Sequence, residues 1–242
     1  MTNVGEIYTS NEGVDGSVAT FDNHGSIWGF RSGIFLVGGS VVNAPGAAIS
    51  GRSEEAINIG VVDNPVEVSL FNAGVLTRQS ASSFFDDASV SGSAGKVEVT
   101  NTGLIVGDIS MFGAAQDTVM NCGETVGDMK TCNGADVFRF VNADQIGRAP
   151  SARPQIRDFQ SGLDVIDLSA IQADPFLFGV DSAFIFILDA PFSGAQPGEL
   201  RFDTGKISGR TLIEGDRSGD GTADFVIELT GAIPMEDRDF IL

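Results

Sequence analysis

The first half of the chain alternates hydrophobic and polar residues in short segments, which are separated by turns rich in asparagine and glycine. Alternation with a period of two is typical of β-strands, and these segments run for only about three to five residues. No long amphipathic helical pattern competes with them. The pattern therefore predicts an all-β protein made of many short strands.

Asparagine followed by glycine two or three positions later recurs at regular intervals. The pairs are Asn23/Gly25, Asn43/Gly46, Asn72/Gly74, Asn101/Gly103 and Asn121/Gly123, at intervals of 20, 29, 29 and 20 residues. The segment from Val99 matches the segment from Val119 at five positions with an offset of 20 residues. A second theme aligns the segment from Gly33 to Leu36 with the segment from Ala56 to Ile59.

Such strands are too short to form independent hairpins, and their spacing predicts a parallel β-solenoid in which each coil stacks its apolar positions on the next. The turn asparagines should then form ladders of side-chain amides, with glycine at left-handed or crowded corner positions. An antiparallel sandwich with coincidental Asn-Gly turns is the alternative.

Charge and composition narrow the function classes. The 33 acidic and 14 basic residues give a net charge of −19, which excludes the basic face that nucleic-acid binding requires. Both halves share the deficit, so the carboxylates repel one another unless cations or salt offset them, and this indicates calcium or a saline medium. The longest apolar runs fall far short of the roughly 18 residues of a membrane span. We therefore expect a soluble protein with no secretory signal at its N-terminus.

Two cysteines, Cys122 and Cys132, lie ten positions apart with Gly123 and Gly127 between them. A loop or an adjacent solenoid turn could close this spacing into a disulfide. Two half-buried thiols are the alternative.

The second half of the chain carries four ordered motifs and a characteristic end. They are GADVFRF from Gly134, IRDFQSGLDVIDLSAI from Ile156, GELRFD from Gly198 and EGDRSGDGTADFVIELTG from Glu214, followed by the terminal DFIL. Their order and spacing resemble the C-terminal domain of the serralysin-type secreted peptidases. That resemblance implies a β-roll and sandwich module that binds calcium and carries the uncleaved signal for type I secretion by an ABC transporter, here Asp239, Phe240, Ile241 and Leu242.

The first half resembles the Asn-Ser-Gly-Thr-Ile repeats of bacterial surface and autotransporter-like proteins, grading into glycine-aspartate repeats of the RTX type. The resemblance divides the chain into a cap or strand-exchange segment (1–22), β-solenoid repeats (23–133) and the serralysin-like module (134–242). It also makes Asp117 and Asp136 candidate calcium ligands, although no full RTX nonapeptide is present.

One loop has the chemistry of a calcium site in its own right. Calcium takes six to eight oxygen ligands, and DRSGDGTAD offers oxygens at loop positions 1, 3, 5, 7 and 9. The predicted ligands are Asp216, Ser218, Asp220, the carbonyl of Thr222, and Asp224. The loop departs from an EF-hand because Ile227 stands where the bidentate glutamate would be, so an acidic turn without an ion is the alternative.

Three more aspartates, Asp158, Asp164 and Asp167, form a second candidate set, since such carboxylates close the last turn of the roll in related modules. Solvated carboxylates beside a strand are the alternative.

The sequence offers little for catalysis. Its single histidine, His24, lies in an Asn-His-Gly turn, so the zinc motif of a peptidase is absent and we expect no enzyme. Paired acids such as Glu54/Glu55 and Asp86/Asp87 could act on glycosidic bonds, but adjacent residues on a strand point to opposite faces.

Two functions follow. The first is a calcium-binding structural or adhesive protein of a Gram-negative bacterium, exported by type I secretion to the surface or medium and able to assemble with itself into a layer, matrix or filament. The second is a secreted carbohydrate-binding or polysaccharide-modifying solenoid, with cell-surface polysaccharide as its partner. Exposed aromatic residues along one face would favour the second, and Tyr8 and Trp28 are the only tyrosine and tryptophan.

Overall fold

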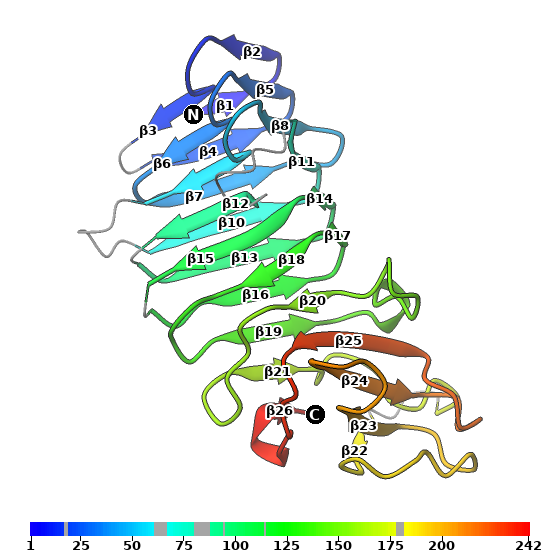
Figure 1. Cartoon of the computed structure of the whole chain (residues 1–242). Helices are drawn as coiled ribbons and strands as arrows, with labels where there is room; N and C mark the ends of the chain where they lie inside the picture. The colour runs from blue at the N-terminus through cyan, green and yellow to red at the C-terminus, as the bar shows by residue number, and fades with distance from the viewer. Residues whose placement is uncertain (17–18, 61–66, 80–87, 94, 114, 178–181) are drawn as a thin grey trace. The chain divides into compact units, whose positions relative to one another are not determined.

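The computed structural model describes residues 1–16, 19–60, 67–79, 88–93, 95–113, 115–177 and 182–242 (Figure 1). Two compact units make up the chain, Met1–Asp136 and Val137–Leu242, and they divide close to the expected boundary at residue 133. The described helices are two three-residue 3-10 helices, η1 (Ala143–Gln145) and η2 (Asp237–Asp239). None of the helices in these ranges is long and apolar enough to cross a membrane. The expected all-β fold is confirmed.

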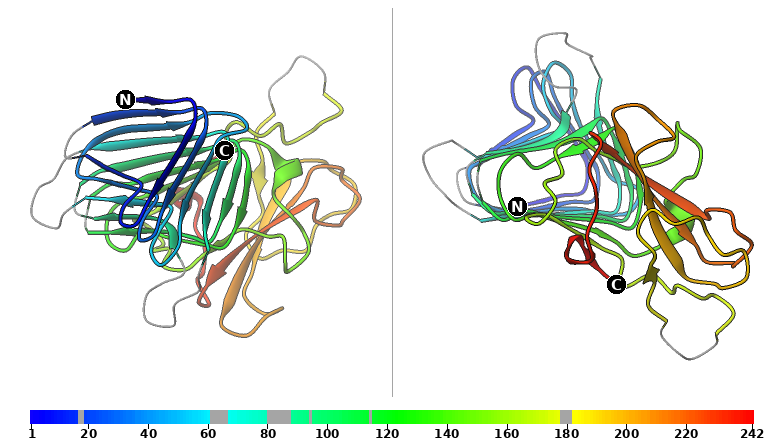
Figure 2. Two further views of the ribbon diagram at one scale, coloured as in Figure 1. Left: turned by 90° about the horizontal axis from the view of Figure 1, so that it is seen from above. Right: turned by 60° about the horizontal axis from the view of Figure 1, so that its bottom comes forward.

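The first unit is a three-sided solenoid of parallel strands. Sheet A contains β1 (Thr2–Asn3), β4 (Ala19–Asn23), β7 (Gly39–Asn43), β10 (Val68–Asn72), β13 (Val97–Asn101) and β16 (Thr118–Asn121). Sheet B contains β2 (Glu6–Thr9), β5 (Ser26–Gly29), β8 (Ala48–Gly51), β11 (Val75–Arg78), β14 (Leu104–Val106) and β17 (Glu124–Val126). Sheet C contains β3 (Val14–Gly16), β6 (Ile34–Leu36), β9 (Ile57–Ile59), β12 (Ala88–Ser93), β15 (Asp108–Phe112) and β18 (Asp128–Lys130). Each coil contributes one strand to each sheet, and Figure 2 shows the coils stacked over one another.

The register of the strands follows the sequence repeats. Val99 pairs with Val119, and Ile34 pairs with Ile57, as the two aligned themes predicted. The alternative of an antiparallel sandwich is therefore wrong for this unit. One apolar column from each sheet fills the interior with side chains that are at most 5% exposed; these columns contain Phe21, Val41, Leu70, Val99 and Val119, then Ile27, Ile49, Leu76 and Ile105, then Ile34, Ile57, Val90, Ile109 and Met129.

A continuous ladder of asparagine side chains runs along the corner between sheets A and B. Each Nδ2 donates to the Oδ1 of the next coil at 2.8–2.9 Å, through Asn3, Asn23, Asn43, Asn72, Asn101 and Asn121. The same Nδ2 groups also donate to backbone carbonyls, as Asn72 does to Gly74 and Leu104. The predicted ladder is confirmed, and it begins one coil earlier than the repeat pattern indicated, at Asn3.

The glycines after these asparagines are needed for close packing between coils. A Cβ at Gly103 would lie 2.2 Å from the carbonyl oxygen of Gly74, and one at Gly123 would lie 2.2 Å from that of Gly103. Of the two expected reasons for glycine, crowding therefore applies at these positions. A left-handed backbone occurs at Gly46, where φ is 79°.

A second polar ladder, built from aspartates, lies at the corner where sheet C leads into sheet A. The amide of Val97 donates to Oδ1 of Asp117 at 2.8 Å, and the amide of Asp117 donates to Oδ1 of Asp136 at 2.8 Å. Both carboxylates are buried. Burial, reinforced by Asp136 and opposed by the Val97 amide and Lys96, raises the pKa of Asp117 to about 7.

Residues 1–22, expected to form a cap or a strand-exchange segment, contain the strands of the first coil and most of β4 in the second. The first-coil strands β1, β2 and β3 pair in parallel with β4, β5 and β6 of the same chain.

The disulfide considered between Cys122 and Cys132 is not formed in the structure, where both residues are thiols. Cys122 follows β16 at the corner between sheets A and B, whereas Cys132 follows β18 on sheet C. In a three-sided coil, ten residues therefore lead to a different corner and do not return the chain to the same one.

The second unit combines short parallel strands with an antiparallel hairpin. One set pairs in parallel and contains β19 (Val137–Phe140), β21 (Val165–Asp167) and β26 (Phe240–Ile241). The other has the order β22 (Ile185–Phe186), β23 (Glu199–Asp203), β24 (Arg210–Asp216), β25 (Phe225–Thr230) and β20 (Gln155–Ile156), with β23, β24 and β25 antiparallel. Phe138, Phe140 and Phe225 are its largest fully buried side chains. This mixture of roll-like and antiparallel strands agrees with the predicted module.

The ladder makes a direct prediction for stability. Replacing Asn72 by alanine removes a fully buried amide and leaves the groups of Asn43 and Asn101 without their partner, so we expect a loss of about 2–4 kcal/mol in the free energy of unfolding. Ser69→Ala, at an exposed position of the same strand, should change it by less than about 0.5 kcal/mol. Denaturant unfolding measures both, and equal small effects would show that the ladder contributes little.

The aspartate ladder predicts a pH dependence. Because the pKa of Asp117 is higher in the folded chain than in the unfolded one, its contribution is most favourable below about pH 4 and declines as pH rises toward about 7. Asp117→Asn keeps the acceptor for the Val97 amide without the charge. We expect this variant to be more stable than the parent at pH 8 by more than about 1 kcal/mol, roughly 2–4 °C in Tm. The gain should vanish at pH 4, and the exposed control Glu6→Gln should show no such trend in thermal unfolding.

Candidate functional site

The hairpin loop between β24 and β25 carries the five predicted calcium ligands. Asp216 ends β24 and is fully buried. Its Oδ1 accepts hydrogen bonds from the Gly219 amide at 2.7 Å and the Ser218 hydroxyl at 3.2 Å, and its Oδ2 accepts one from the Gly221 amide at 2.8 Å. The loop thus folds around the carboxylate of Asp216, which accepts hydrogen bonds from two loop amides and one loop hydroxyl.

The other two carboxylates of this loop are also bound to backbone amides. Oδ2 of Asp224 accepts from Arg217 at 2.8 Å and Ser218 at 2.9 Å. Oδ1 of Asp220 accepts from the amide of Thr222 at 2.8 Å. The left-handed glycines Gly219 and Gly221, with φ of 74° and 83°, allow the tight bends.

These contacts test whether the loop suits calcium as it stands. Its carboxylates point at separate groups of amides, and nowhere in the described residues do three His, Cys, Asp or Glu side chains gather around a common point. In this structure the loop is an acidic turn held by its own hydrogen bonds, as in the alternative interpretation. Calcium ligation by Asp216, Ser218, Asp220, Thr222 and Asp224 stays a prediction.

The remaining candidate ligands are divided between the two units. Asp117 and Asp136 form the ladder of the first unit described above. In the second unit, Asp164 is buried and its Oδ2 accepts from the Gln160 amide at 2.8 Å, closing a turn, whereas Asp158 is partly exposed. Oδ1 of Asp167, which ends β21, binds the amide and hydroxyl of Ser169. These carboxylates, too, serve as acceptors for nearby donors.

The chain end predicted as the secretion signal is folded into the second unit. Asp239 is fully buried, with Oδ1 accepting from the Gly162 amide at 2.7 Å and Oδ2 accepting from the Ser161 hydroxyl at 2.8 Å. Its Oδ2 also accepts from the amide of Glu236 and completes a capping box around η2. Three hydrogen bonds therefore hold the Asp239 carboxylate in the folded unit.

The residues that follow Asp239 form a strand. Phe240 and Ile241 pair with Ile166 and Asp167 of β21, and the ring of Phe240 lies 4.8 Å from that of Phe186. Leu242 ends the chain and is partly exposed. The terminal motif is thus both the predicted signal and an element of the fold.

A charged cluster on β23 and β24 was missed from the sequence. Arg201 binds Asp203 at 2.6 Å and Glu214 at 3.3 Å, and Lys206 binds Glu214 at 2.7 Å. Burial alone would raise the pKa of Asp203, but the amides of Gly205 and Lys206 and the nearby cations outweigh it and lower that pKa. The cluster balances buried charge across the antiparallel strands. Only the strand register, which pairs Arg201 with Glu214, could have revealed it.

The geometry can be compared with known proteins. No curated protein matches the chain. Among solved structures, the AlgE6R3 subunit of the mannuronan C5-epimerase from Azotobacter vinelandii is similar over 66% of this chain and 82% of that subunit, at 17% identity and a TM-score of 0.34. Residues 48–242 match the family described as peptidase M10 serralysin C terminal, which extends the resemblance from residue 134 back into the solenoid. The chain therefore belongs to the family of serralysin C-terminal domains.

Proposed function

We propose that the protein is an extracellular structural or adhesive solenoid, delivered by type I secretion from a Gram-negative bacterium. The family match over residues 48–242 is the observation that carries this proposal, since domains of this family serve export and not peptide-bond hydrolysis. Residues 1–47 add further coils of the same solenoid. The proposal assigns no catalytic role to the chain.

The construction of the first unit supports a structural role. Its interior holds the apolar columns, and its corners hold the two polar ladders, so most outward-pointing side chains are not needed for folding. A stacked array of this kind can present many side chains at fixed spacing along one direction. That property suits a protein that attaches to an extended surface or builds one.

Self-association is part of the proposal, and exposed apolar positions support it. Val106 and Val126 are neighbours on the outer face of sheet B and are 36% and 50% exposed. Phe71, on the outer face of sheet A, is 41% exposed. Apolar side chains in adjacent strands provide area that a second copy could bury.

Calcium is left out of the proposed mechanism. The loop carboxylates are already bound to amides, as described above, so the fold of the second unit has a source of stability that needs no ion. Several of the acidic residues that first indicated calcium are buried and accept hydrogen bonds, so they have a structural role of their own.

We expect export to depend on the last four residues. Deleting Asp239–Leu242 should keep the protein inside cells that carry a type I transporter, because the signal is lost. The deletion also removes the strand that pairs with β21, so a matched variant is needed. Ile166→Ala weakens that same packing but leaves the terminal sequence intact, and it should still be exported.

Immunoblots of medium and cells measure both outcomes. Normal export of the deleted chain would overturn the assignment of Asp239–Leu242 as the signal. Retention of both variants would show that export fails for lack of folding and not for lack of a signal.

We also expect the purified protein to associate. Light scattering should give a mass that rises with concentration to multiples of the 25.3 kDa chain, equally in millimolar calcium and in chelator. Val126→Lys should lower that mass, because it places a charge in the exposed apolar strip of sheet B. A single 25.3 kDa species at all concentrations would contradict self-association, and a mass that grows only in calcium would restore the ion to the mechanism.

A further inference from the structure

The only tyrosine and the only tryptophan of the chain lie against each other on the outer face of sheet B. Tyr8 of β2 and Trp28 of β5 are register neighbours, with ring centroids 3.9 Å apart and planes inclined by 8°. Tyr8 is 75% exposed. The pair therefore contributes little to the core and presents a flat aromatic surface to solvent.

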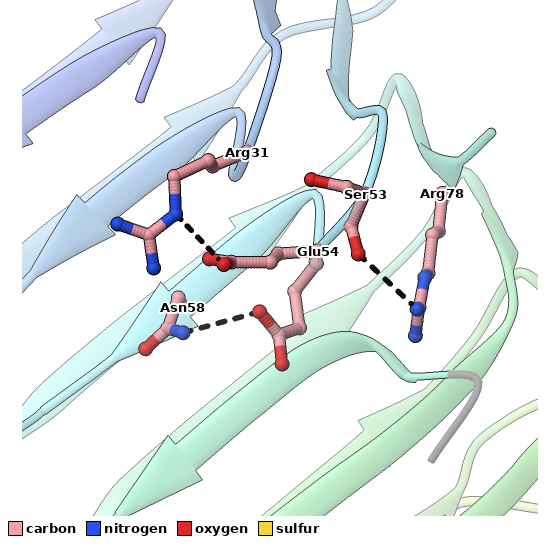
Figure 3. A pocket seen from close by; sticks show the side chains of 6 residues that line it. Arg31, Ser53, Glu54, Asn58 and Arg78 are labelled. Atoms are coloured by element: carbon pink, nitrogen blue, oxygen red, sulfur yellow. Dashed lines mark hydrogen bonds and ion pairs between the residues drawn. The ribbon is translucent and has the colours of Figure 1, made fainter. Parts of the chain in front are cut away.

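A polar pocket opens at the corner that follows sheet B, and the ring stack is connected to it. The indole Nε1 of Trp28 donates to Oε1 of Gln79 at 3.4 Å, and Gln79 directly follows Arg78, which lines the pocket. The pocket has a volume of about 270 Å³ and is shown in Figure 3. Its lining residues are Arg31, Ser53, Glu54, Glu55, Asn58 and Arg78, all of which can form hydrogen bonds.

The planar side chains of the pocket are held in place by one another. Arg31 donates to Glu54 at 2.8 Å, and Asn58 donates to Glu55 at 3.1 Å (Figure 3). These contacts fix one guanidinium, one amide and two carboxylates before any ligand arrives. A site whose polar groups are already ordered loses less conformational entropy when it binds.

The position of Arg78 explains why the pocket forms at this corner. In the register of sheet B, Arg78 follows Gly29 and Gly51 of the preceding coils, which have no side chain at that position. Arg78 is therefore the first long side chain in this column, which begins with Thr9 of β2, and its Nη2 donates to the carbonyl of Ser53 at 3.3 Å. This change from glycine to arginine places a second cation in the pocket.

The charges of the pocket balance. Two arginines face two glutamates, in a chain whose net charge is −19. An acidic ligand would be repelled by the rest of the protein without a net positive site to hold it. A neutral ligand with many hydroxyl groups can instead bond to carboxylates, amide and guanidinium together.

We propose that the Tyr8–Trp28 stack and the pocket bind a neutral oligosaccharide. The CH face of one pyranose ring lies on the exposed aromatic surface, and the hydroxyls of another unit of the same sugar chain bond to Glu54, Glu55 and Asn58. The site deepens the proposed adhesive role by naming its partner class, and in that sense rests on it. Binding by the purified protein depends on neither export nor self-association, so each can fail without the other.

The single tryptophan makes the test direct. All tryptophan emission comes from Trp28, so a titration of the full chain with cellohexaose or with maltohexaose should give a saturable change in fluorescence. Tyr8→Ala removes the platform but keeps the reporter and should weaken binding by about fivefold or more, since a lost stacking contact is worth about 1 kcal/mol or more. Glu55→Ala should weaken it as well, because Asn58 loses its partner and the sugar loses an acceptor.

Phe71→Ala is the matched control, because it removes an exposed ring from sheet A and should leave binding unchanged. Circular dichroism checks that each variant is folded. No change in emission and no heat in calorimetry with either neutral hexaose would overturn the proposal. So would equal losses in Tyr8→Ala and Phe71→Ala, and binding of oligogalacturonate alone would overturn the assignment of a neutral ligand.

Discussion

The asparagine ladder is the interaction on which the first unit depends. A buried side-chain amide has two donors and an acceptor with two lone pairs, and leaving them unbonded is costly. Stacking the same residue in successive coils satisfies them, because the Nδ2 of each residue meets the Oδ1 of the next at 2.8–2.9 Å. The requirement that every asparagine lie over its neighbour fixes the register of all three sheets. It also requires glycine at the corners, because a Cβ at Gly103 would lie too close to the carbonyl oxygen of Gly74.

Buried carboxylates, like the buried amides of the ladder, also need hydrogen-bond partners inside the fold. Four buried aspartates each accept a hydrogen bond from at least one backbone amide: Asp117, Asp164, Asp216 and Asp239. Partial positive charge on several amides can stabilise a carboxylate without a cation, as at Asp216 and Asp239. Where only one amide is available, as at Asp117, burial prevails and the pKa rises. The negative charge of this chain is thus in part structural, and composition alone could not distinguish buried acceptors from ligands for an ion.

Much of the first unit could be predicted from the sequence, because its contacts repeat. The 20-residue alignment that matches Asn101 with Asn121 implied that their strands pair in the same register, and this register is observed. The repeat pattern as stated missed Asn3, although Asn3 and Gly5 precede Asn23 and Gly25 by 20 residues. The second unit has no internal repeat, so the register that pairs Arg201 with Glu214 was beyond reach. The loop after Asp216 was recognised by its composition, but which donors its oxygens bind is decided by the turns at Gly219 and Gly221.

The candidate ligand surface shows the other limit of sequence reasoning. The scarcity of tyrosine and tryptophan argued against sugar binding, because a row of aromatics was expected. The parallel register brings the only two into a single stack. It also places Arg78 in a column where the two preceding coils have glycine. Since the interior and the ladders already specify the fold, outward positions such as these are free to vary at little cost in stability. On a strand, the paired glutamates Glu54 and Glu55 would point to opposite faces. They lie instead on a corner between β8 and β9, where both line one pocket. The other acidic pair, Asp86/Asp87, lies outside the described residues. The pocket is therefore formed by residues of three successive coils that meet at one corner, an arrangement that no single segment of the sequence contains.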